Sequence, residues 1–263
     1  MNSTPRPATR PATGCRPVLQ LAPDWVQGAT PAGDAEFLCE MVAIHQPAHM
    51  VELGVASGVS SAYLLHALDR LPDVPGRRLL RSCDVQATCY FDAARATGEA
   101  VQAMYPLPRT GWILDTNTDA RRLSQSLPPQ SVDLTFIDAN HYHPWPLLDL
   151  LHMSAIATRG SWVILHDINL PVIAPEFSAW GAKWLFDEWP FEKAAGGLEH
   201  SIGAVRLPED LDQLVPFATA LLERPWEHAP TLWHVALPDP FSLLQAAIAR
   251  RLGLAGHEPG NRR

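Results

Sequence analysis

The sequence predicts an α/β fold: a doubly wound, mostly parallel sheet of seven strands that ends in a C-terminal antiparallel hairpin. Two observations predict it. Short apolar runs alternate along the chain with longer segments whose apolar residues recur at helical spacing. Polar side chains directly follow several of the apolar runs, as expected where strands end at one edge of an open sheet. This alternation implies right-handed crossovers and helices on both faces of the sheet.

The first expected strand lies between two helical segments. Residues Gly33–His45 have apolar side chains at helical spacing, and Asp34 is expected to cap that helix. The apolar run His49–Gly54 ends in glycine, and Val59–Asp69 then shows an apolar stripe. This order predicts a strand, a tight turn and a helix.

The alternation of strands and helices continues as far as residue 189. The strands expected in this stretch are Leu79–Val85, Trp112–Asp115, Val132–Asp138 and Ser161–Asp167, and the helices are expected near Ala87–Met104, Ala120–Leu127, Leu147–Ile156 and Ala179–Trp189.

A hairpin is expected to close the sheet. The segments Phe191–Ala195 and Ser201–Leu207 flank a glycine pair, with too few residues between them for a crossover helix. Two further helices, Leu211–Leu222 and Phe241–Leu252, are expected after the hairpin.

Length and composition favour a single domain. The chain has 263 residues, of which 47% are hydrophobic, and this is enough for one sizeable core. We expect residues 1–20 to be a disordered, proline-rich tail and residues 256–263 to be a flexible tail. Residues 21–255 are expected to form the domain, including its C-terminal helical extension.

Composition also narrows the classes of partner and location. The formal net charge of -8, without a dense Lys/Arg stripe, argues against nucleic acid and favours a small-molecule substrate. Neither a signal peptide nor a membrane-spanning run is visible, so we expect a cytoplasmic protein with no membrane partner. The four cysteines match no metal-binding spacing and are expected to be reduced thiols. Homo-oligomerisation is left open.

The segment from Glu52 to Gly58 is the first candidate binding element. Gly54 and Gly58 remove side chains where a ligand must approach the backbone, and the start of a helix offers N–H groups. With Ala56 and Ser57 between the glycines, the turn is expected to bind a nucleotide-type ligand, unless the glycines serve packing alone. The carboxylate of Glu52 would repel a pyrophosphate but suits a cationic ligand, which favours S-adenosylmethionine (SAM) over NAD.

Asp84 follows the second expected strand. A carboxylate at this strand end is placed to accept hydrogen bonds from the two hydroxyl groups of a ribose. A lone aspartate at such a position can instead cap the next helix. The combination of Asp84 with Glu52 and the glycine turn favours the ribose interpretation.

Polar and ionisable side chains gather after the fourth and fifth expected strands. In open α/β sheets, ligands bind outside the carboxyl ends of the strands, which is where these side chains fall. The group comprises Asp138, His141, His143, His166 and Asp167.

In this order, the motifs resemble those of class I SAM-dependent methyltransferases, particularly the small-molecule O-methyltransferase branch grouped with cephalosporin-hydroxylase-like and catechol-type enzymes. The resemblance extends over Met50–Leu207 and rests on VELGVASGVSS, SCDV, VDLTFIDANH and WVILHDIN. It implies a Rossmann-like methyltransferase fold and transfer of a methyl group from SAM to a hydroxyl group of a small molecule.

The resemblance also implies a set of cofactor-binding residues. Asp84 would bind the ribose, and the third strand end, between Asp115 and Thr118, would flank the adenine. The whole implied set is Glu52, Gly54, Ala56, Ser57, Gly58, Asp84, Asp115 and Asp138.

Catechol-type members of this group hold a divalent cation with acidic residues at the fourth and fifth strand ends, and Asp138 and Asp167 match those positions. The sequence departs from that pattern because His166 precedes Asp167 and Ile168 follows it. The third ligand is therefore missing, or it is replaced by His166 or Asn140. Oxygen ligands suit Mg²⁺, whereas added imidazoles favour Mn²⁺. The sequence leaves metal dependence open.

Methyl transfer to oxygen requires the hydroxyl proton to be removed or its pKa to be lowered. His141 and His166, with Asp138 beside them, are the candidate catalytic residues, although each histidine could serve only as scaffold. Two other functions are weighed: a non-catalytic cofactor-binding protein and an NAD(P)-dependent oxidoreductase. The oxidoreductase fingerprint G-x-G-x-x-G is absent, because Ala56 and Val59 stand where its second and third glycines belong.

Overall fold

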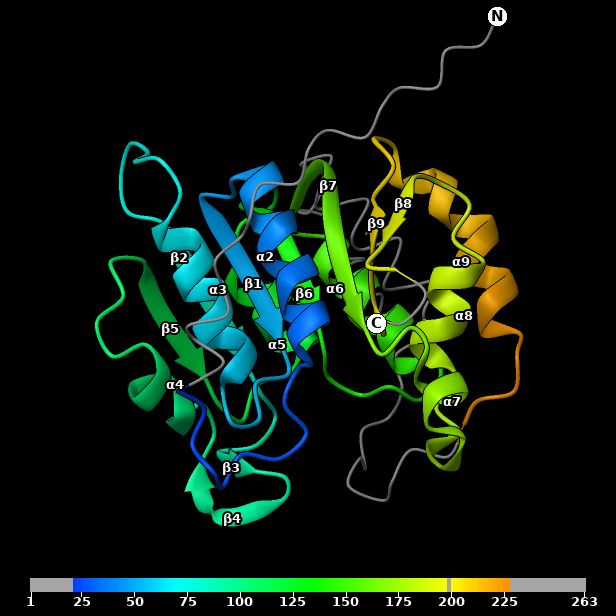
Figure 1. The fold of residues 1–263 in the computed structure, drawn as a ribbon. Coiled ribbons are helices and arrows are strands. Elements are labelled where there is room, and N and C mark those ends of the chain that lie inside the picture. The colour runs from blue at the N-terminus through cyan, green and yellow to red at the C-terminus, as the bar shows by residue number, and fades with distance from the viewer. Residues whose placement is uncertain (1–20, 198–199, 228–263) are drawn as a thin grey trace, which may run out of the picture.

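Seven strands form one sheet in the computed structural model, which describes residues 21–197 and 200–227 (Figure 1). Their order in the sheet is β5-β2-β1-β6-β7-β9-β8. The strands are β1 (His49–Leu53), β2 (Leu79–Cys83), β5 (Gly111–Asp115), β6 (Val132–Ile137), β7 (Ala157–His166), β8 (Lys193–Ala195) and β9 (Ile202–Arg206). The predicted fold class is confirmed.

Strand direction follows the prediction as well. The pairs β1–β2, β1–β6, β2–β5 and β6–β7 are parallel. Strand β9 runs antiparallel to both β7 and β8, so the C-terminal hairpin is confirmed. Because β9 inserts between β7 and β8, the last strand in the sequence is not the last in the sheet.

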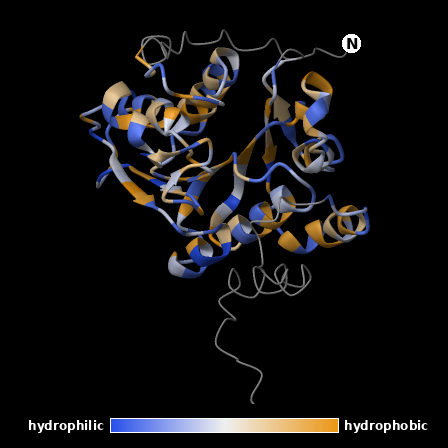
Figure 2. Cartoon of the chain, turned by 90° about the horizontal axis from the view of Figure 1, so that it is seen from below, coloured by the Kyte–Doolittle hydropathy of each residue, from blue (hydrophilic) through white to orange (hydrophobic). Residues whose placement is uncertain are grey.

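Helices cover both faces of the sheet (Figure 1). They are α2 (Ala32–His45), α3 (Val59–Asp69), α4 (Glu99–Met104), α5 (Ala120–Ser126), α6 (Trp145–Ser154), α7 (Leu170–Ile173), α8 (Gly181–Asp187) and α9 (Val215–Leu222), with 3₁₀ turns η1 (Pro175–Phe177) and η2 (Leu211–Leu214). In Figure 2 the helices outside the sheet carry both apolar and polar residues, as expected of helices that bury one side.

Neighbouring residues of the central strands point into two apolar clusters, one on each face. On β6, Phe136 packs in the cluster formed with α2, α3 and α4, whereas Ile137 packs in the cluster formed with α5, α6, α8 and α9. Burying a side chain of this size contributes about 1.5–3 kcal/mol. The two clusters hold the strand ends rigidly, which is what a ligand site at one edge of the sheet requires.

One predicted helix is wrong over most of its length. Instead of a helix across Ala87–Met104, the chain forms a hairpin of β3 (Thr88–Cys89) and β4 (Asp92–Ala96), and only α4 is helical. Alanines in this stretch favour a helix, but contacts to the rest of the fold override that preference. The hydroxyl of Thr97 donates to the carbonyl of Gln86, which holds the two ends of the hairpin together.

Two smaller expectations also fail. Asp34 does not cap α2, because Pro31 stands at the N-cap and the Asp34 side chain is buried. Cys83 and Cys89 are free thiols as expected, but Cys39 on α2 is disulfide-bonded.

The proline-rich tail 1–20, the helix Phe241–Leu252 and the tail 256–263 lie outside the described residues, so the single-domain assignment stays a prediction. Within the described part of the chain, no helix is both long enough and apolar enough to cross a membrane.

Replacement of Gly54 by Ala is expected to lower the free energy of unfolding by more than replacement of Gly76 by Ala. The φ angles are 85° at Gly54 and 86° at Gly76, so both variants carry a left-handed strain of about 1–2 kcal/mol. An added Cβ at Gly76 meets no atom within 4 Å, but at Gly54 it would lie 2.0 Å from the carbonyl oxygen of Asp138. Overpacking should add about 1–3 kcal/mol. Urea denaturation measures both; equal losses would contradict the steric argument.

Candidate functional site

The candidate site lies at the carboxyl ends of β1, β2, β6 and β7. Because these strands are parallel neighbours, the residues that follow them meet at one edge of the sheet. From β1 the chain continues to β2 and β5 on one side of the sheet, and it then returns to β6 and β7 on the other side. Open α/β sheets bind ligands at the point between the two sides, here between β1 and β6.

The glycine turn after β1 packs directly against the end of β6. The N–H of Asp138 donates to the carbonyl of Leu53 at 2.8 Å, and Gly54 has no Cβ that would collide with the backbone of Asp138. Ala56 adopts a left-handed conformation with φ of 46°. This sterically unfavourable conformation shapes the turn that precedes α3.

Gly58 and Ser57 join the turn to the start of α4. A Cβ on Gly58 would lie 2.8 Å from the Cα of Gly98, so this position relies on glycine for a close backbone contact. The carbonyl of Ser57 accepts a hydrogen bond from the N–H of Ala100 at 2.9 Å, and Ser57 is 3% exposed. The predicted turn residues thus form one rigid unit with α4.

Asp84 lies immediately after β2 and bonds the glycine turn. Its Oδ2 accepts hydrogen bonds from the N–H groups of Val55 at 2.9 Å and Ala56 at 3.1 Å, and its Oδ1 accepts one from Gln86 at 2.8 Å. The carboxylate therefore fixes the turn at the same strand end where a ribose ligand was expected. Its role as a ribose ligand stays a prediction.

Asp115 ends β5 beside the end of β2, since Cys83 and Asp115 are register partners. Its Oδ2 lies 2.5 Å from Nε of Arg81, and its carbonyl accepts the N–H of Asp84 at 3.0 Å. The third strand end therefore adjoins the turn through Asp84, on the side where the adenine was expected.

Glu52 lies in β1 underneath the turn and is fully buried. Its carboxylate accepts hydrogen bonds of 2.6 Å from the hydroxyls of Ser60 and Ser61 on α3 and of Ser82 on β2. Burial raises the pKa of Glu52 to about 7, and the hydroxyl donors only partly offset that rise. The structure thus encloses Glu52 with these three serines underneath the turn. Its role as a cofactor-binding residue stays a prediction.

The acidic and histidine side chains predicted at the next two strand ends come together. Nε2 of His141 lies 3.4 Å from Oδ1 of Asp138 and 3.1 Å from Oδ2 of Asp167. Nδ1 of His166 lies 3.2 Å from Oδ1 of Asp138 and 3.4 Å from Oδ1 of Asp167. His143 is buried apart from this group, with its ring against Trp184.

Charge complementarity sets the pKa values in this cluster. Burial opposes ionisation of Asp138, but the adjacent imidazoles of His166 and His141 hold the pKa of that carboxyl below its usual range. For both histidines, burial likewise opposes the charged form, but the neighbouring carboxylates raise the pKa of His141 and raise that of His166 further.

Asp138, His141 and Asp167 form a donor set that suits a metal ion, with one ligand atom from each within 4.8 Å of the others. The sequence left the third ligand missing, or replaced by His166 or Asn140. In the structure, Nε2 of His166 faces Asp34, at 3.2 Å from Oδ2, while its Nδ1 faces the two acids, and the Oδ1 of Asn140 accepts the N–H of Tyr142. Which of these residues binds a metal stays a prediction. Two carboxylates and one imidazole are compatible with Mn²⁺ or Mg²⁺.

Two elements outside the strand ends fix the loop that carries His141. The N–H of Gly181, at the start of α8, donates to the carbonyl of His141 at 3.0 Å, and a Cβ on Gly181 would lie 2.7 Å from that oxygen. Glu227 accepts hydrogen bonds from the N–H groups of His143 and Trp180. The loop is therefore clamped between β6 and α8.

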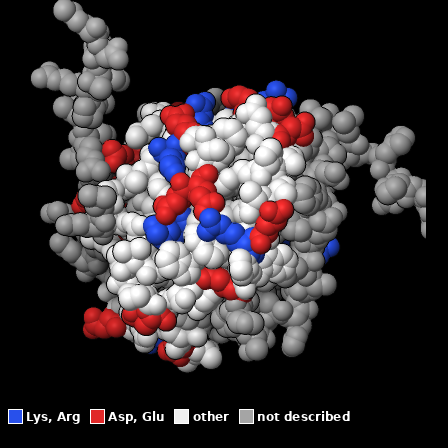
Figure 3. Space-filling view, turned by 90° about the vertical axis from the view of Figure 1, so that its right-hand side faces the viewer, with Lys and Arg blue, Asp and Glu red and all other residues white. Residues whose placement is uncertain are grey.

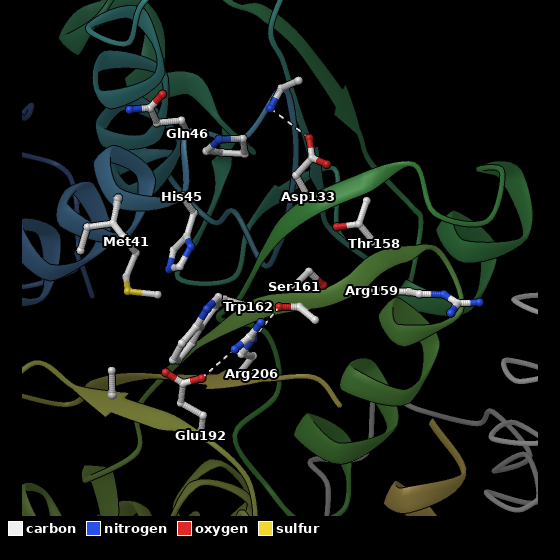
Figure 4. Close-up of a pocket in the computed structure, with 15 residues that line it drawn as sticks. Met41, His45, Gln46, Asp133, Thr158, Arg159, Ser161, Trp162, Glu192 and Arg206 are labelled. Atoms are coloured by element: carbon white, nitrogen blue, oxygen red, sulfur yellow. Dashed lines mark hydrogen bonds and ion pairs between the residues drawn. The ribbon is translucent and has the colours of Figure 1, made fainter. Parts of the chain in front are cut away.

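A cavity of about 790 Å³ lies at the opposite edge of the sheet (Figure 4). Several of its polar side chains are engaged within the protein. Asp133 accepts the N–H groups of Ala48 and His49, and Arg206 pairs with Glu192. Among the described residues, the group of acids and histidine that could hold a metal ion lies at the carboxyl edge, outside this cavity.

Sequence reasoning missed Asp34 and the three serines around Glu52. A carboxylate in an otherwise apolar strand requires donors, and the serine pair that begins α3 was the available signal for them. Asp34 had no such signal, because its contacts are made across the fold: Oδ1 accepts the N–H of Ser201, 167 residues away.

Comparison with known proteins finds a family match over part of the chain. Residues 51–168 match the family described as "Methyltransferase domain". A search of curated proteins finds no match.

Solved structures resemble the chain in fold. A methyltransferase from Geobacter sulfurreducens is 15% identical with a TM-score of 0.51, over 72% of this chain and 85% of that chain. A protein from Corynebacterium glutamicum is 15% identical with a TM-score of 0.51, over 76% and 92%. An O-methyltransferase from Bacillus cereus in complex with SAH is 17% identical with a TM-score of 0.48, over 75% and 92%. At such identities, the first two similarities establish the fold alone.

Replacement of Glu52 by Gln is expected to remove part of the pH dependence of stability. The folded-state pKa of Glu52, about 7, exceeds its ordinary value of 4.5, so its stabilising contribution is complete below pH 4.5 and is lost as pH rises to 7. Relative to Glu52→Gln, the wild type should lose up to about 3 kcal/mol across that range. Urea denaturation of both proteins between pH 4.5 and pH 8 measures this difference. Parallel pH profiles would contradict the assignment.

Proposed function

We propose that the protein transfers the methyl group of SAM to a hydroxyl group of a small molecule, with a divalent cation at the acid–histidine cluster. The match of residues 51–168 to the family described as "Methyltransferase domain" supports this proposal. The observation that carries the proposal is the packing of the glycine turn against Asp138. It brings the expected cofactor element and the metal-compatible donor set, Asp138, His141 and Asp167, to one edge of the sheet.

The residues at this edge fit a cationic cofactor. SAM carries a sulfonium and an ammonium group, and Asp84, Asp115 and Asp138 all lie at the ends of the strands around the turn. Carboxylates attract such charges, whereas they would repel the pyrophosphate of NAD. Asp84 would hold the ribose, and the turn from Gly54 to Gly58 would lie against the methionine part.

The donor set also fits a divalent cation. Two carboxylates and one imidazole come from the ends of β6 and β7 and from the clamped loop between β6 and α6. When bound, SAM supplies an electrophilic methyl group, and a cation at this cluster would lower the pKa of the acceptor hydroxyl. Asp138, His141 and Asp167 would hold the cation, and His166 would keep the carboxylate of Asp138 in place.

A small-molecule acceptor agrees with the charge distribution. Figure 3 shows acidic and basic side chains side by side on the face that carries α8, β8 and α9, without a large patch of one sign among its coloured residues. Ion pairs on this side join Lys183 to Asp187 and Arg224 to Glu188. Binding nucleic acid requires a basic surface instead. A cytoplasmic location is part of the proposal, and cell fractionation tests it.

SAM binding is expected to depend on Asp84. Isothermal titration calorimetry of the full chain should show binding of SAM and no binding of NADH. The Asp84→Ala substitution should lower the affinity for SAM about 10- to 100-fold, because hydrogen bonds to a charged group contribute about 1.5–3 kcal/mol each. Asp133→Ala is the matched control. Its carboxylate also accepts two backbone N–H groups, but at the opposite edge of the sheet.

Binding of NADH in place of SAM would contradict the proposal, as would SAM binding that Asp133→Ala weakens as much as Asp84→Ala does. A wild-type protein that binds SAM but methylates no hydroxyl compound in a diverse acceptor screen would instead favour the non-catalytic alternative.

Mn²⁺ affinity is expected to fall at least about 10-fold in His141→Ala, because one of three protein ligands is lost. His49→Ala, at the other end of β1, should bind Mn²⁺ as the wild type does. The electron paramagnetic resonance signal of free Mn²⁺ during a titration gives both dissociation constants. Unchanged affinity in His141→Ala would remove His141 from the ligand set.

A further inference from the structure

Asp34 carries a buried carboxylate beside the site, and the proposed function gives it no role. It lies in the first turn of α2, and its side chain is 2% exposed. Its Oδ2 lies 3.2 Å from Nε2 of His166, and its Oδ1 lies 3.3 Å from Nδ1 of His200. Oδ1 also accepts the N–H of Ser201 at 3.2 Å. A carboxylate this deeply buried is costly unless such partners match its charge.

His166 connects Asp34 to the acid cluster. Its side chain is 9% exposed, and its two ring nitrogens face carboxylates on opposite sides: Nε2 faces Asp34 and Nδ1 faces Asp138. The ring also packs edge-on against Phe136, with centroids 6.3 Å apart and an interplanar angle of 79°. Held at both ends and along one edge, the imidazole has little freedom to rotate.

Residues around Asp34 hold His200 and the start of β9 in place. A Cβ on Gly33 would lie 2.0 Å from Cε1 of His200, so only glycine leaves room for that ring beside Asp34. The side chain of Asn169 donates to the carbonyl of His200 at 2.8 Å, and its N–H donates to the hydroxyl of Ser201 at 3.1 Å. The start of β9 is thereby fastened to the turn that follows Asp167.

We propose that Asp34 is a positioning residue for the carboxylate of Asp138, acting through His166. His166 and His141 both approach Oδ1 of Asp138, so together they set the rotation of that carboxylate and leave its second oxygen for a ligand. Asp34 anchors the far side of the His166 ring and so keeps Nδ1 in place. The inference rests on the proposed function in one respect: Asp138 is taken as a cation ligand.

Asp34→Asn keeps the size of the side chain but removes its charge. We expect the dissociation constant for Mn²⁺ to rise at least about 10-fold, the lower end of the 10- to 100-fold range found when partners of metal ligands are removed. Asp69→Asn is the matched control. Asp69 is also buried, and it accepts hydrogen bonds from the backbone N–H groups of Arg109 and Thr110 at the far edge of the sheet. The affinity of the Asp69→Asn variant for Mn²⁺ should stay within about twofold of that of the wild type.

A readout that needs no metal separates this inference from the proposed function. Crystal structures of the metal-free wild type and of Asp34→Asn should show Nδ1 of His166 beside Asp138 in the wild type and turned away from it in the variant. The inference is overturned if Asp34→Asn keeps wild-type Mn²⁺ affinity, if Asp69→Asn loses as much affinity, or if the ring keeps its place in the variant. If the wild type binds no Mn²⁺, the metal assignment of the proposed function fails, and the position of the ring alone decides.

Discussion

The close approach of Gly54 to the backbone of Asp138 joins the two halves of the candidate site. Strand β1 carries the turn that suits a nucleotide-type cofactor, and β6 carries the first residue of the acid–histidine cluster. Because the two strands are hydrogen-bonded neighbours at the point where the sheet reverses its order, no loop movement is needed to bring these parts together. The distance between the glycine turn and the first acid of the cluster is thus set by the register of two adjacent strands.

Three acids at or beside the site are accommodated in two different ways. Glu52 is surrounded by serine hydroxyls, which bear no charge, so burial dominates and its pKa rises. Asp34 and Asp138 instead share an imidazole between them. A neutral donor shell keeps the underside of the turn rigid without adding positive charge beneath a cationic ligand. The paired acids, by contrast, are matched by an imidazole that bears positive charge when protonated.

The sequence predicted the parts of this protein that depend on local pattern. The alternation of apolar runs with helical stripes was enough to place the seven strands, the closing hairpin and the residues that follow β6 and β7. It failed at Ala87–Met104, where alanines favour a helix but a hairpin forms instead, with Thr97 bonded to Gln86 and Ala87. It could not choose between His141 and His166 as partners of the two acids, because only the fold orients their rings: Nε2 of His141 faces Asp167, whereas the His166 ring lies between Asp138 and Asp34.

The contact between Asp34 and Ser201 closes a loop of 167 residues, so it belongs to the last parts of the molecule that can assemble. Forming so distant a contact closes a long loop, and non-local contacts of this kind form slowly relative to local pairing. On the ribosome, the strands that carry Asp138 and Asp167 emerge before β9 does. A nascent chain can therefore pair its parallel strands while the last anchor of the site is still missing. Asp138 and Asp167 are thus synthesised before the segment that completes the anchoring of their side chains.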